Sequence, residues 1–288
     1  MYPAKFEYFR ANSVREAIQL LQDHSGSKLL AGGHSLIPMM KLRLAQPGAL
    51  IDIGHVSELA GITENNGAIR IGALTTHTEL VTSALLKQRC PLLSEAAAQI
   101  ADPQVRNRGT IGGNLAHADP GSDLPAVVLA LDAVFHLSGP GGDRTSKASD
   151  FFLDLFMTDL QPEEILIAVE MPALPPGSGS CYLKFENPAS GYAVCGVAAV
   201  MRLDAGGSCQ SAALAINGVT AAPHKASGVA DALKGKTPED GTIHQAVDEH
   251  LEFTDPMGDL YASASYRVEL ARVYSKRALK AARDRARK

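Results

Sequence analysis

The sequence contains no tryptophan, and aromatic residues make up only 5% of it. Proteins that bind single-stranded nucleic acid stack bases on aromatic side chains, so this composition argues against that class. A net charge of −4 offers nucleic acid no strongly positive surface. No apolar run approaches the roughly 20 residues that span a bilayer. Residues 1–13 also lack the apolar core of a signal peptide. We therefore expect a cytoplasmic protein without a transmembrane segment and without a nucleic-acid partner.

Several catalytic and metal-binding patterns are also absent. The four cysteines form no CxxC pair, so we expect free thiols and no iron–sulfur or zinc site in this chain. His117 and Asp119 could start a metal site, but no third ligand is near, and we predict none. No GxSxG or HExxH motif supplies a nucleophile or a zinc-bound base. We predict no catalytic side chain, so that any chemistry must come from a bound cofactor.

Two glycine-rich stretches stand out instead, AGGHSLIPMMKLRLAQP from Ala31 and TIGGNLAHADPGSDLP from Thr110. Glycines allow backbone N–H groups to converge on an anion, and the hydroxyl and amide groups of Ser35, Thr110 and Asn114 can add donors. Neither stretch continues as a Walker A sequence, and neither has GxGxxG spacing. Two such stretches predict a ligand with more than one phosphate, although a double glycine taken alone more often marks a tight turn than a ligand site.

Neighbouring residues leave alternatives open. His34 could donate to a phosphate or simply fill a turn, and Asp123 could accept from ribose hydroxyls or cap a helix. The basic residues of the C-terminal helix could form a solvated face or contact a partner subunit.

The hydrophobic pattern predicts an α+β fold. Residues 1–55 read as a β-α-β-α-β unit, with a capping box at Ser13 and Glu16. Residues 56–175 begin with a hairpin around an Asn-Gly turn and a second capping box at Thr76 and Glu79. The linker PALPPGSGS, from Pro172, precedes a C-terminal domain of three antiparallel strands followed by helices. We therefore predict three domains, which comprise residues 1–55, 56–175 and 176–288.

Through these segments, the sequence resembles the FAD-binding medium subunit of the molybdenum hydroxylases. The likeness rests on AGGHSLIPMMKLRLAQP, on ADPQVRNRGTIGGNLAHADPGSDLPA and on the opening Phe6–Arg10, and it covers essentially the whole chain. It is nearer to aerobic carbon monoxide dehydrogenase than to xanthine dehydrogenase. The resemblance implies a two-subdomain FAD-binding fold of the vanillyl-alcohol-oxidase (PCMH) type, followed by the C-terminal domain.

The resemblance also implies the cofactor site. The two glycine stretches match the loops that bind the FAD pyrophosphate, and four further positions match an aspartate, a backbone contact, a lysine near the flavin and an aromatic residue over the isoalloxazine. The implied residues are Ala31, Gly32, Gly33, His34, Ser35, Thr110, Ile111, Gly112, Gly113, Asn114, Asp123, Leu166, Lys184 and Tyr192. Around Tyr192 the chain reads SGYA where carbon monoxide dehydrogenases read GDYA or GDWA, which weakens the assignment of carbon monoxide as substrate.

By the same resemblance, the partners are a large molybdenum-cofactor subunit and a small 2Fe-2S subunit in a dimer of heterotrimers. FAD would take electrons from the clusters and pass them to an external acceptor. Two other interpretations remain open. One is a self-contained FAD-dependent oxidase or reductase of the same fold; the other is a non-catalytic scaffold whose glycines only form turns.

Overall fold

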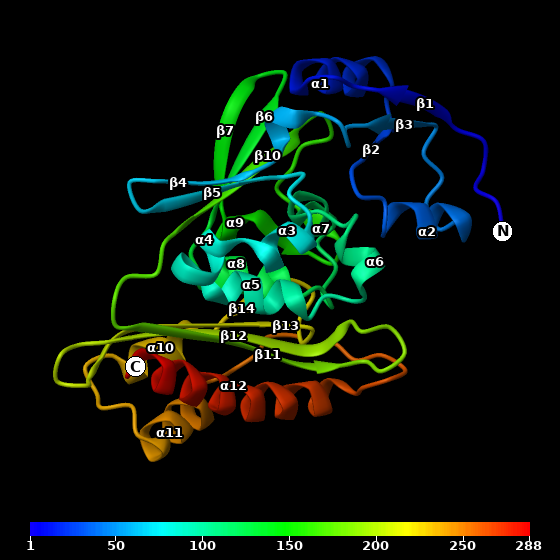
Figure 1. Ribbon diagram of the computed structural model, residues 1–288. Coiled ribbons are helices and arrows are strands. Elements are labelled where there is room, and N and C mark those ends of the chain that lie inside the picture. Colours follow the sequence, from blue (N-terminus) through cyan, green and yellow to red (C-terminus); the bar gives the residue numbers. More distant parts are fainter.

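The computed structural model describes residues 1–288 and contains three main β-sheets. In Figure 1 the N-terminal sheet lies at the upper right, the middle sheet lies beside it at the upper left, and the C-terminal sheet lies below. The sheets are built from residues 7–52, 62–172 and 178–225. None of the helices combines the length and the apolar character that crossing a membrane requires. The α+β class is confirmed, whereas the domain boundaries after residues 55 and 175 stay a prediction.

The N-terminal sheet has the order β1-β3-β2 and is entirely parallel, because a helix forms each crossover between its strands. The predicted β-α-β-α-β unit is therefore confirmed. Ser13 accepts a hydrogen bond from Glu16 N–H at 3.1 Å, but the Glu16 carboxylate accepts from Asn12 N–H, so only half of the predicted capping box forms. The elements are β1 (Glu7–Arg10), α1 (Val14–Asp23), β2 (Lys28–Leu30), α2 (Leu36–Lys41), β3 (Ala49–Asp52) and the 3-10 helix η1 (Ser57–Leu59).

The middle sheet is antiparallel with the order β4-β5-β10-β6-β7, so its last strand in sequence lies at its centre. The predicted Asn-Gly hairpin forms, with Asn66 at φ +50° and Gly67 at φ +79°, the positive values that a type I′ turn needs. A bulge in β10 follows Leu166. The strands are β4 (Ile62–Asn65), β5 (Ala68–Gly72), β6 (Val134–Gly139), β7 (Gly142–Lys147) and β10 (Ile165–Pro172).

A layer of short helices lies between the middle and C-terminal sheets (Figure 1). The capping box at Thr76 and Glu79 is complete, and Pro125 lies in the first turn of its helix as expected. The second glycine stretch is not a loop, since Gly112 and Gly113 lie inside a helix. The layer contains α3 (His77–Thr82), α4 (Ala84–Arg89), α5 (Pro91–Ala98), α6 (Pro103–Arg106), α7 (Ile111–His117), α8 (Leu124–Ala130), α9 (Ala148–Phe151) and the hairpin β8 (Phe152–Asp154)–β9 (Met157–Thr158).

The C-terminal sheet has four strands, so the predicted count of three was wrong by one. The additional strand has only two residues and is too short to show an alternating pattern in the sequence. Helices cover the face that points away from the middle layer (Figure 1). The elements are β11 (Ser178–Glu186), β12 (Ala193–Leu203), β13 (Cys209–Asn217), β14 (His224–Lys225), α10 (Ser227–Leu233), α11 (Asp240–His250) and α12 (Ala264–Ala286).

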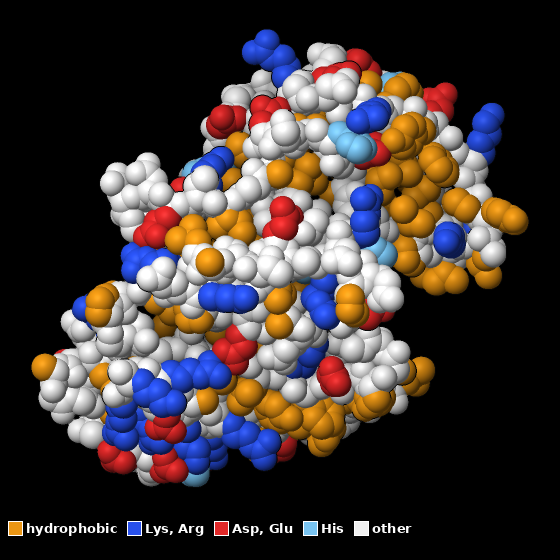
Figure 2. All heavy atoms as spheres, in the orientation of Figure 1, with side chains coloured by type: hydrophobic (Ala, Val, Ile, Leu, Met, Phe, Trp, Pro, Cys, Tyr) orange, Lys and Arg blue, Asp and Glu red, His pale blue; other side chains and the backbone are white.

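Several basic residues of α12 form ion pairs within the chain. Lys280 and Arg283 contact the Asp240 carboxylate at 3.1 and 2.7 Å, and Lys276 contacts Asp248 at 2.5 Å. Figure 2 shows the resulting mixture of blue and red side chains over α11 and α12, at the lower left. Ion pairs with α11 therefore account for part of the positive charge of α12. The four cysteines are free and buried, as expected.

Candidate functional site

The first glycine stretch, Ala31–Ser35, joins β2 to α2. Gly33 has a φ of +76°, which only glycine adopts without strain. The backbone N–H groups from Gly32 to Leu36 donate no hydrogen bond to any group of the chain. Ser35, at the start of α2, makes no side-chain capping bond either. A run of successive free N–H groups is suited to binding an anion.

The second stretch lies directly against the first. A Cβ atom placed on Gly32 would lie 2.1 Å from the carbonyl oxygen of Arg108 and 2.9 Å from Cα of Gly109. One placed on Gly113 would lie 3.9 Å from Cβ of Ala31. The first stretch thus meets the backbone of Arg108 and Gly109, which leads directly into the second stretch, and a side chain at Gly32 would push the two segments apart.

The amides of the second stretch, by contrast, are mostly used within the protein. Ile111 N–H donates to Thr75 O at 2.9 Å, Gly112 N–H donates to Ala73 O at 2.8 Å, and Gly113 N–H donates to Thr110 Oγ1 at 3.2 Å. The sequence led us to expect free amides in both stretches, and the structure provides them mainly in the first. Gly112 has a packing role, because a Cβ atom there would lie 2.5 Å from that of Ala73.

A single cavity of about 850 Å³ opens between the first stretch, α7 and the tip of the β11–β12 loop. It is lined by twelve of the fourteen predicted residues: Ala31, Gly32, Gly33, His34, Ser35, Thr110, Gly112, Gly113, Asn114, Asp123, Leu166 and Tyr192. Ile111 does not line it, because its side chain is fully buried in the core of the middle layer. Lys184 does not line it either and lies beneath its floor.

Asp123 forms part of that floor. Its side chain does not cap α8, so the capping alternative was wrong. The carboxylate instead accepts a hydrogen bond from Tyr182 O–H at 2.7 Å and lies 3.2 Å from the Lys184 ammonium. Burial raises the pKa of Asp123 to about 6, although Lys184 and Tyr182 oppose the shift. A buried carboxylate therefore connects the cavity to the C-terminal sheet.

An Asp123→Asn variant is expected to lose a pH-dependent part of the stability. The pKa of Asp123 is about 6 in the folded chain, whereas that of an unfolded aspartate is about 3.9. Between these values the folded state binds the proton more tightly, so the contribution is complete below about pH 4 and is lost as the pH rises through about 6. In urea unfolding, the stability of the native chain minus that of the variant should fall by about 1–3 kcal/mol from pH 4 to pH 7. A constant difference would contradict this assignment.

Lys184 holds the segment that carries Tyr192. Its side chain is only 2% exposed, and its ammonium donates to the carbonyl groups of Gln99 at 2.6 Å and Gly191 at 2.9 Å. Tyr192 itself is 44% exposed. Partial burial raises the pKa of Tyr192, and a hydrogen bond with Ser35 opposes the shift. Lys184 thus acts through backbone carbonyls and Asp123, while the Tyr192 ring faces the cavity.

The structure adds residues that the sequence did not single out. His77, the first residue of α3, lines the cavity although it is only 3% exposed, and its Nδ1 has no hydrogen-bond partner. Burial, with a smaller effect of Arg106, lowers the pKa of His77 to about 4, so the ring is neutral at pH 7. Phe156 also lines the cavity, and Tyr182 supports it from below through its hydrogen bond to Asp123. No periodicity or motif marks these three positions.

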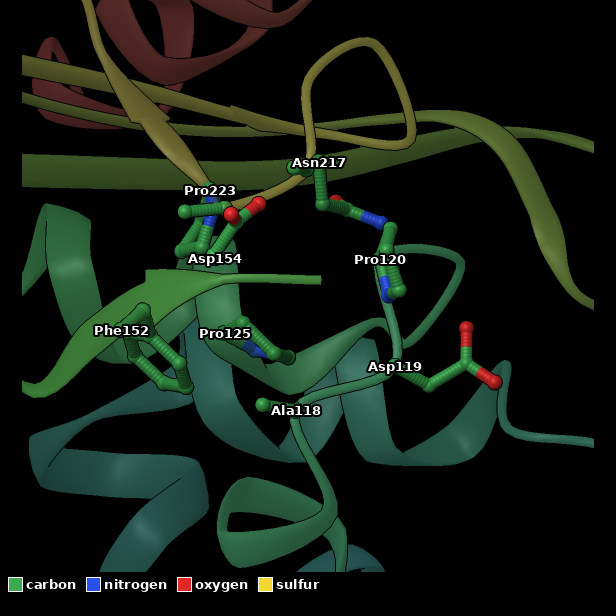
Figure 3. A pocket seen from close by; sticks show the side chains of 10 residues that line it. Ala118, Asp119, Pro120, Pro125, Phe152, Asp154, Asn217 and Pro223 are labelled. Carbon is green, nitrogen blue, oxygen red and sulfur yellow. The ribbon is translucent and has the colours of Figure 1, made fainter. Parts of the chain in front are cut away.

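A second, very small pocket lies beside this network (Figure 3). Asn217 borders it together with Pro120, Pro125 and Pro223, and its volume of about 10 Å³ has room for about one water molecule. Asn217 Nδ2 is buried without a partner. Asn217 Oδ1 lies 3.5 Å from the Tyr182 hydroxyl group, so this small pocket lies next to the residues that support the floor of the cavity.

Comparison with known proteins gives two family matches. Residues 4–174 match a family described as the FAD binding domain in molybdopterin dehydrogenase. Residues 180–282 match the CO dehydrogenase flavoprotein C-terminal domain. Together these matches cover most of the chain.

Individual relatives are similar over their whole length. The chain is 44% identical to the carbon monoxide dehydrogenase medium chain of Hydrogenophaga pseudoflava, and the match covers 98% of each chain. It is 38% identical to subunit alpha of the 6-hydroxypseudooxynicotine dehydrogenase complex of Paenarthrobacter nicotinovorans, over 100% of this chain and 97% of the relative. A solved carbon monoxide dehydrogenase structure from Hydrogenophaga pseudoflava superposes with a TM-score of 0.95 at 44% identity, covering 99% of each chain.

Proposed function

The chain belongs to the molybdopterin dehydrogenase FAD-binding family, and from that membership we propose that it is the electron-transfer subunit of a heterotrimeric molybdenum hydroxylase. Its cofactor is FAD. Its partners are a large molybdenum-cofactor subunit and a small 2Fe-2S subunit, assembled as a dimer of heterotrimers in the cytoplasm. Electrons reach this chain from the clusters and leave it for an external acceptor. The support is the full-length similarity to subunits of such dehydrogenases.

The residues around the cavity fit FAD. The free N–H groups from Gly32 to Leu36 offer donors to an anionic diphosphate, with the hydroxyl group of Ser35 beside them. A volume of about 850 Å³ lies within the range of about 300–1,000 Å³ typical of ligand cavities. Away from the free amides, Met39, Leu160 and Leu166 give the cavity apolar walls. The free amides that open into this cavity are the observation that carries the proposal.

Eleven of the fourteen predicted residues have a role in this assignment. Gly32, Gly33, His34 and Ser35 hold the phosphates, and Thr110 and Asn114 complete the polar end. Asp123 and Leu166 line the cavity wall, and Tyr192 shields its mouth. Ile111 and Lys184 support the site without lining the cavity: Ile111 packs in the core, and Lys184 holds Asp123 and the segment that carries Tyr192. Bound FAD supplies the redox chemistry, and the chain supplies binding, orientation and exclusion of water.

Carbon monoxide is the substrate that we propose for the complex. The medium chain with 44% identity belongs to a carbon monoxide dehydrogenase. The relative that matches at 38% identity belongs to a 6-hydroxypseudooxynicotine dehydrogenase complex, so this subunit type serves different substrates. Because the substrate is oxidised on the large subunit in this proposal, oxidation assays of the assembled complex with each candidate substrate decide between them.

The proposal predicts that the isolated chain binds FAD in a 1:1 ratio and becomes yellow, but oxidises no substrate. Adding the large and small subunits should restore bleaching of the flavin absorbance by substrate. A chain that stays colourless after incubation with FAD would overturn the proposal. Rapid oxidation of NADH or an alcohol by the chain alone would indicate a self-contained flavoenzyme instead.

A further inference from the structure

The β8–β9 hairpin exposes a cluster of large apolar side chains. Leu153, Leu155, Phe156 and Met157 are each between 50% and 55% exposed. The two aromatic residues before this cluster lie in the hydrophobic core. Phe151 and Phe152 are buried, and their ring centroids lie 4.0 and 5.8 Å, respectively, from that of Phe135. The hairpin is thus anchored by one set of rings while its tip remains outside the core.

Phe156 is unusual within that tip. It has a φ of +54°, a strained backbone conformation that a bulky side chain rarely adopts. The same residue lines the 850 Å³ cavity, together with Met157 and Thr158. Leu155, its neighbour in the sequence, does not line the cavity although it is equally exposed. The strained backbone therefore accompanies a ring placed at the cavity rather than in the core.

The Phe156 ring has a neighbour at the cavity wall. Its centroid lies 5.1 Å from that of His117, with the two planes inclined by 39°, and His117 lines the same cavity. Four residues further along, a Cβ atom on Gly121 would lie 3.2 Å from the Tyr192 ring. The short segment from His117 to Gly121 thus supports aromatic rings from two different hairpins, and both rings line one cavity.

We propose that Phe156 is a cofactor-contacting residue whose phenyl ring packs against one of the two planar rings of the bound dinucleotide, held in place by His117. This inference rests on the proposed function, since it requires FAD in the cavity. Aromatic rings pack with centroids about 4.5–7 Å apart and stabilise a bound ring beyond simple burial of area. A ligand ring packed against the half-exposed Phe156 ring would bury its exposed apolar face.

The experiment compares Phe156→Ala with Phe156→Tyr, which keeps a ring, and with Leu155→Ala, which removes an equally exposed side chain outside the cavity. Dissociation constants of the chain are measured by titration with FAD, FMN and ADP, and the bound flavin is tested for quenching by iodide. Phe156→Ala should weaken FAD binding by about 10-fold, whereas the other two variants should stay within about twofold of the native chain. Phe156→Gly, which removes the ring and relieves the positive φ, should weaken binding equally and excludes misfolding as the cause.

The ligands distinguish the two rings of FAD. Weaker FMN binding and greater iodide quenching in Phe156→Ala place the phenyl ring against the isoalloxazine, and weaker ADP binding places it against the adenine. Either result supports the inference. Native FAD, FMN and ADP affinities in both Phe156→Ala and Phe156→Gly would overturn it, as would equal losses in Leu155→Ala. A native chain that binds no FAD would overturn the proposed function instead.

Discussion

A Gly32→Ala chain is expected to lose most of its bound FAD. The added methyl group would lie 2.1 Å from the backbone carbonyl oxygen of Arg108, far inside contact distance, and its position is fixed by the Cα atom that carries it. Neither group can rotate away, so the first glycine stretch must move away from the backbone that leads into the second stretch. Overpacking of this kind costs about 1–3 kcal/mol. If that cost falls on the FAD-bound arrangement, affinity decreases roughly 5- to 150-fold.

The matched control for this prediction is Gly48→Ala, in the same N-terminal region. A Cβ atom on Gly48 would meet nothing within 4 Å, and this glycine has no positive φ. The control should therefore keep its FAD, as measured by the ratio of absorbance at about 450 nm to that at 280 nm after gel filtration. Equal flavin content in the two variants would show that the contact between the stretches is not needed for binding.

A Lys184→Met chain is expected to be the least stable of the variants at neutral pH. Lys184 is almost completely buried and pairs with the equally buried Asp123, so its removal leaves a carboxylate without its cation. Breaking one side of a buried pair costs about 3–5 kcal/mol. The loss of unfolding free energy should become smaller toward pH 5. Burial raises the pKa of Asp123 to about 6, so at pH 5 the carboxyl group is mostly protonated and carries no charge that Lys184 would have to balance.

Lys225→Met provides the comparison, since it removes the same charge from a pair at the surface. The side chains of Lys225 and its partner Asp132 are 30% and 71% exposed, and such pairs contribute about 0–1 kcal/mol. Urea unfolding of both variants at pH 5 and pH 7 measures the difference. A Lys184→Met loss no larger than that of Lys225→Met would mean that the buried pair adds nothing to stability. Because Lys184 also holds the Gly191 carbonyl, faster proteolysis of the loop that carries Tyr192 should accompany the loss.

Structural features that are specified by residues close together in the sequence were predicted correctly. The Asn66-Gly67 turn, the Thr76–Glu79 capping box and the β-α-β-α-β order depend on neighbouring residues and on periodicity, and all three are present. The position of the first glycine stretch, between a strand and a helix, was also predicted correctly. The second stretch was harder to predict, because its Gly112 serves helix packing against Ala73, a residue distant in the sequence.

The sequence by itself determined the α+β class, the family and the segments that meet at the cavity. Only the tertiary structure decided which groups face that cavity. Asp123 pairs with Tyr182 and Lys184 rather than capping its helix, and Ile111 turns into the core. Phe156 reaches the cavity from a hairpin that no motif marks. The physical reason is that burial, pairing and the direction of a side chain depend on contacts between residues far apart in the chain, and a local pattern does not specify those contacts.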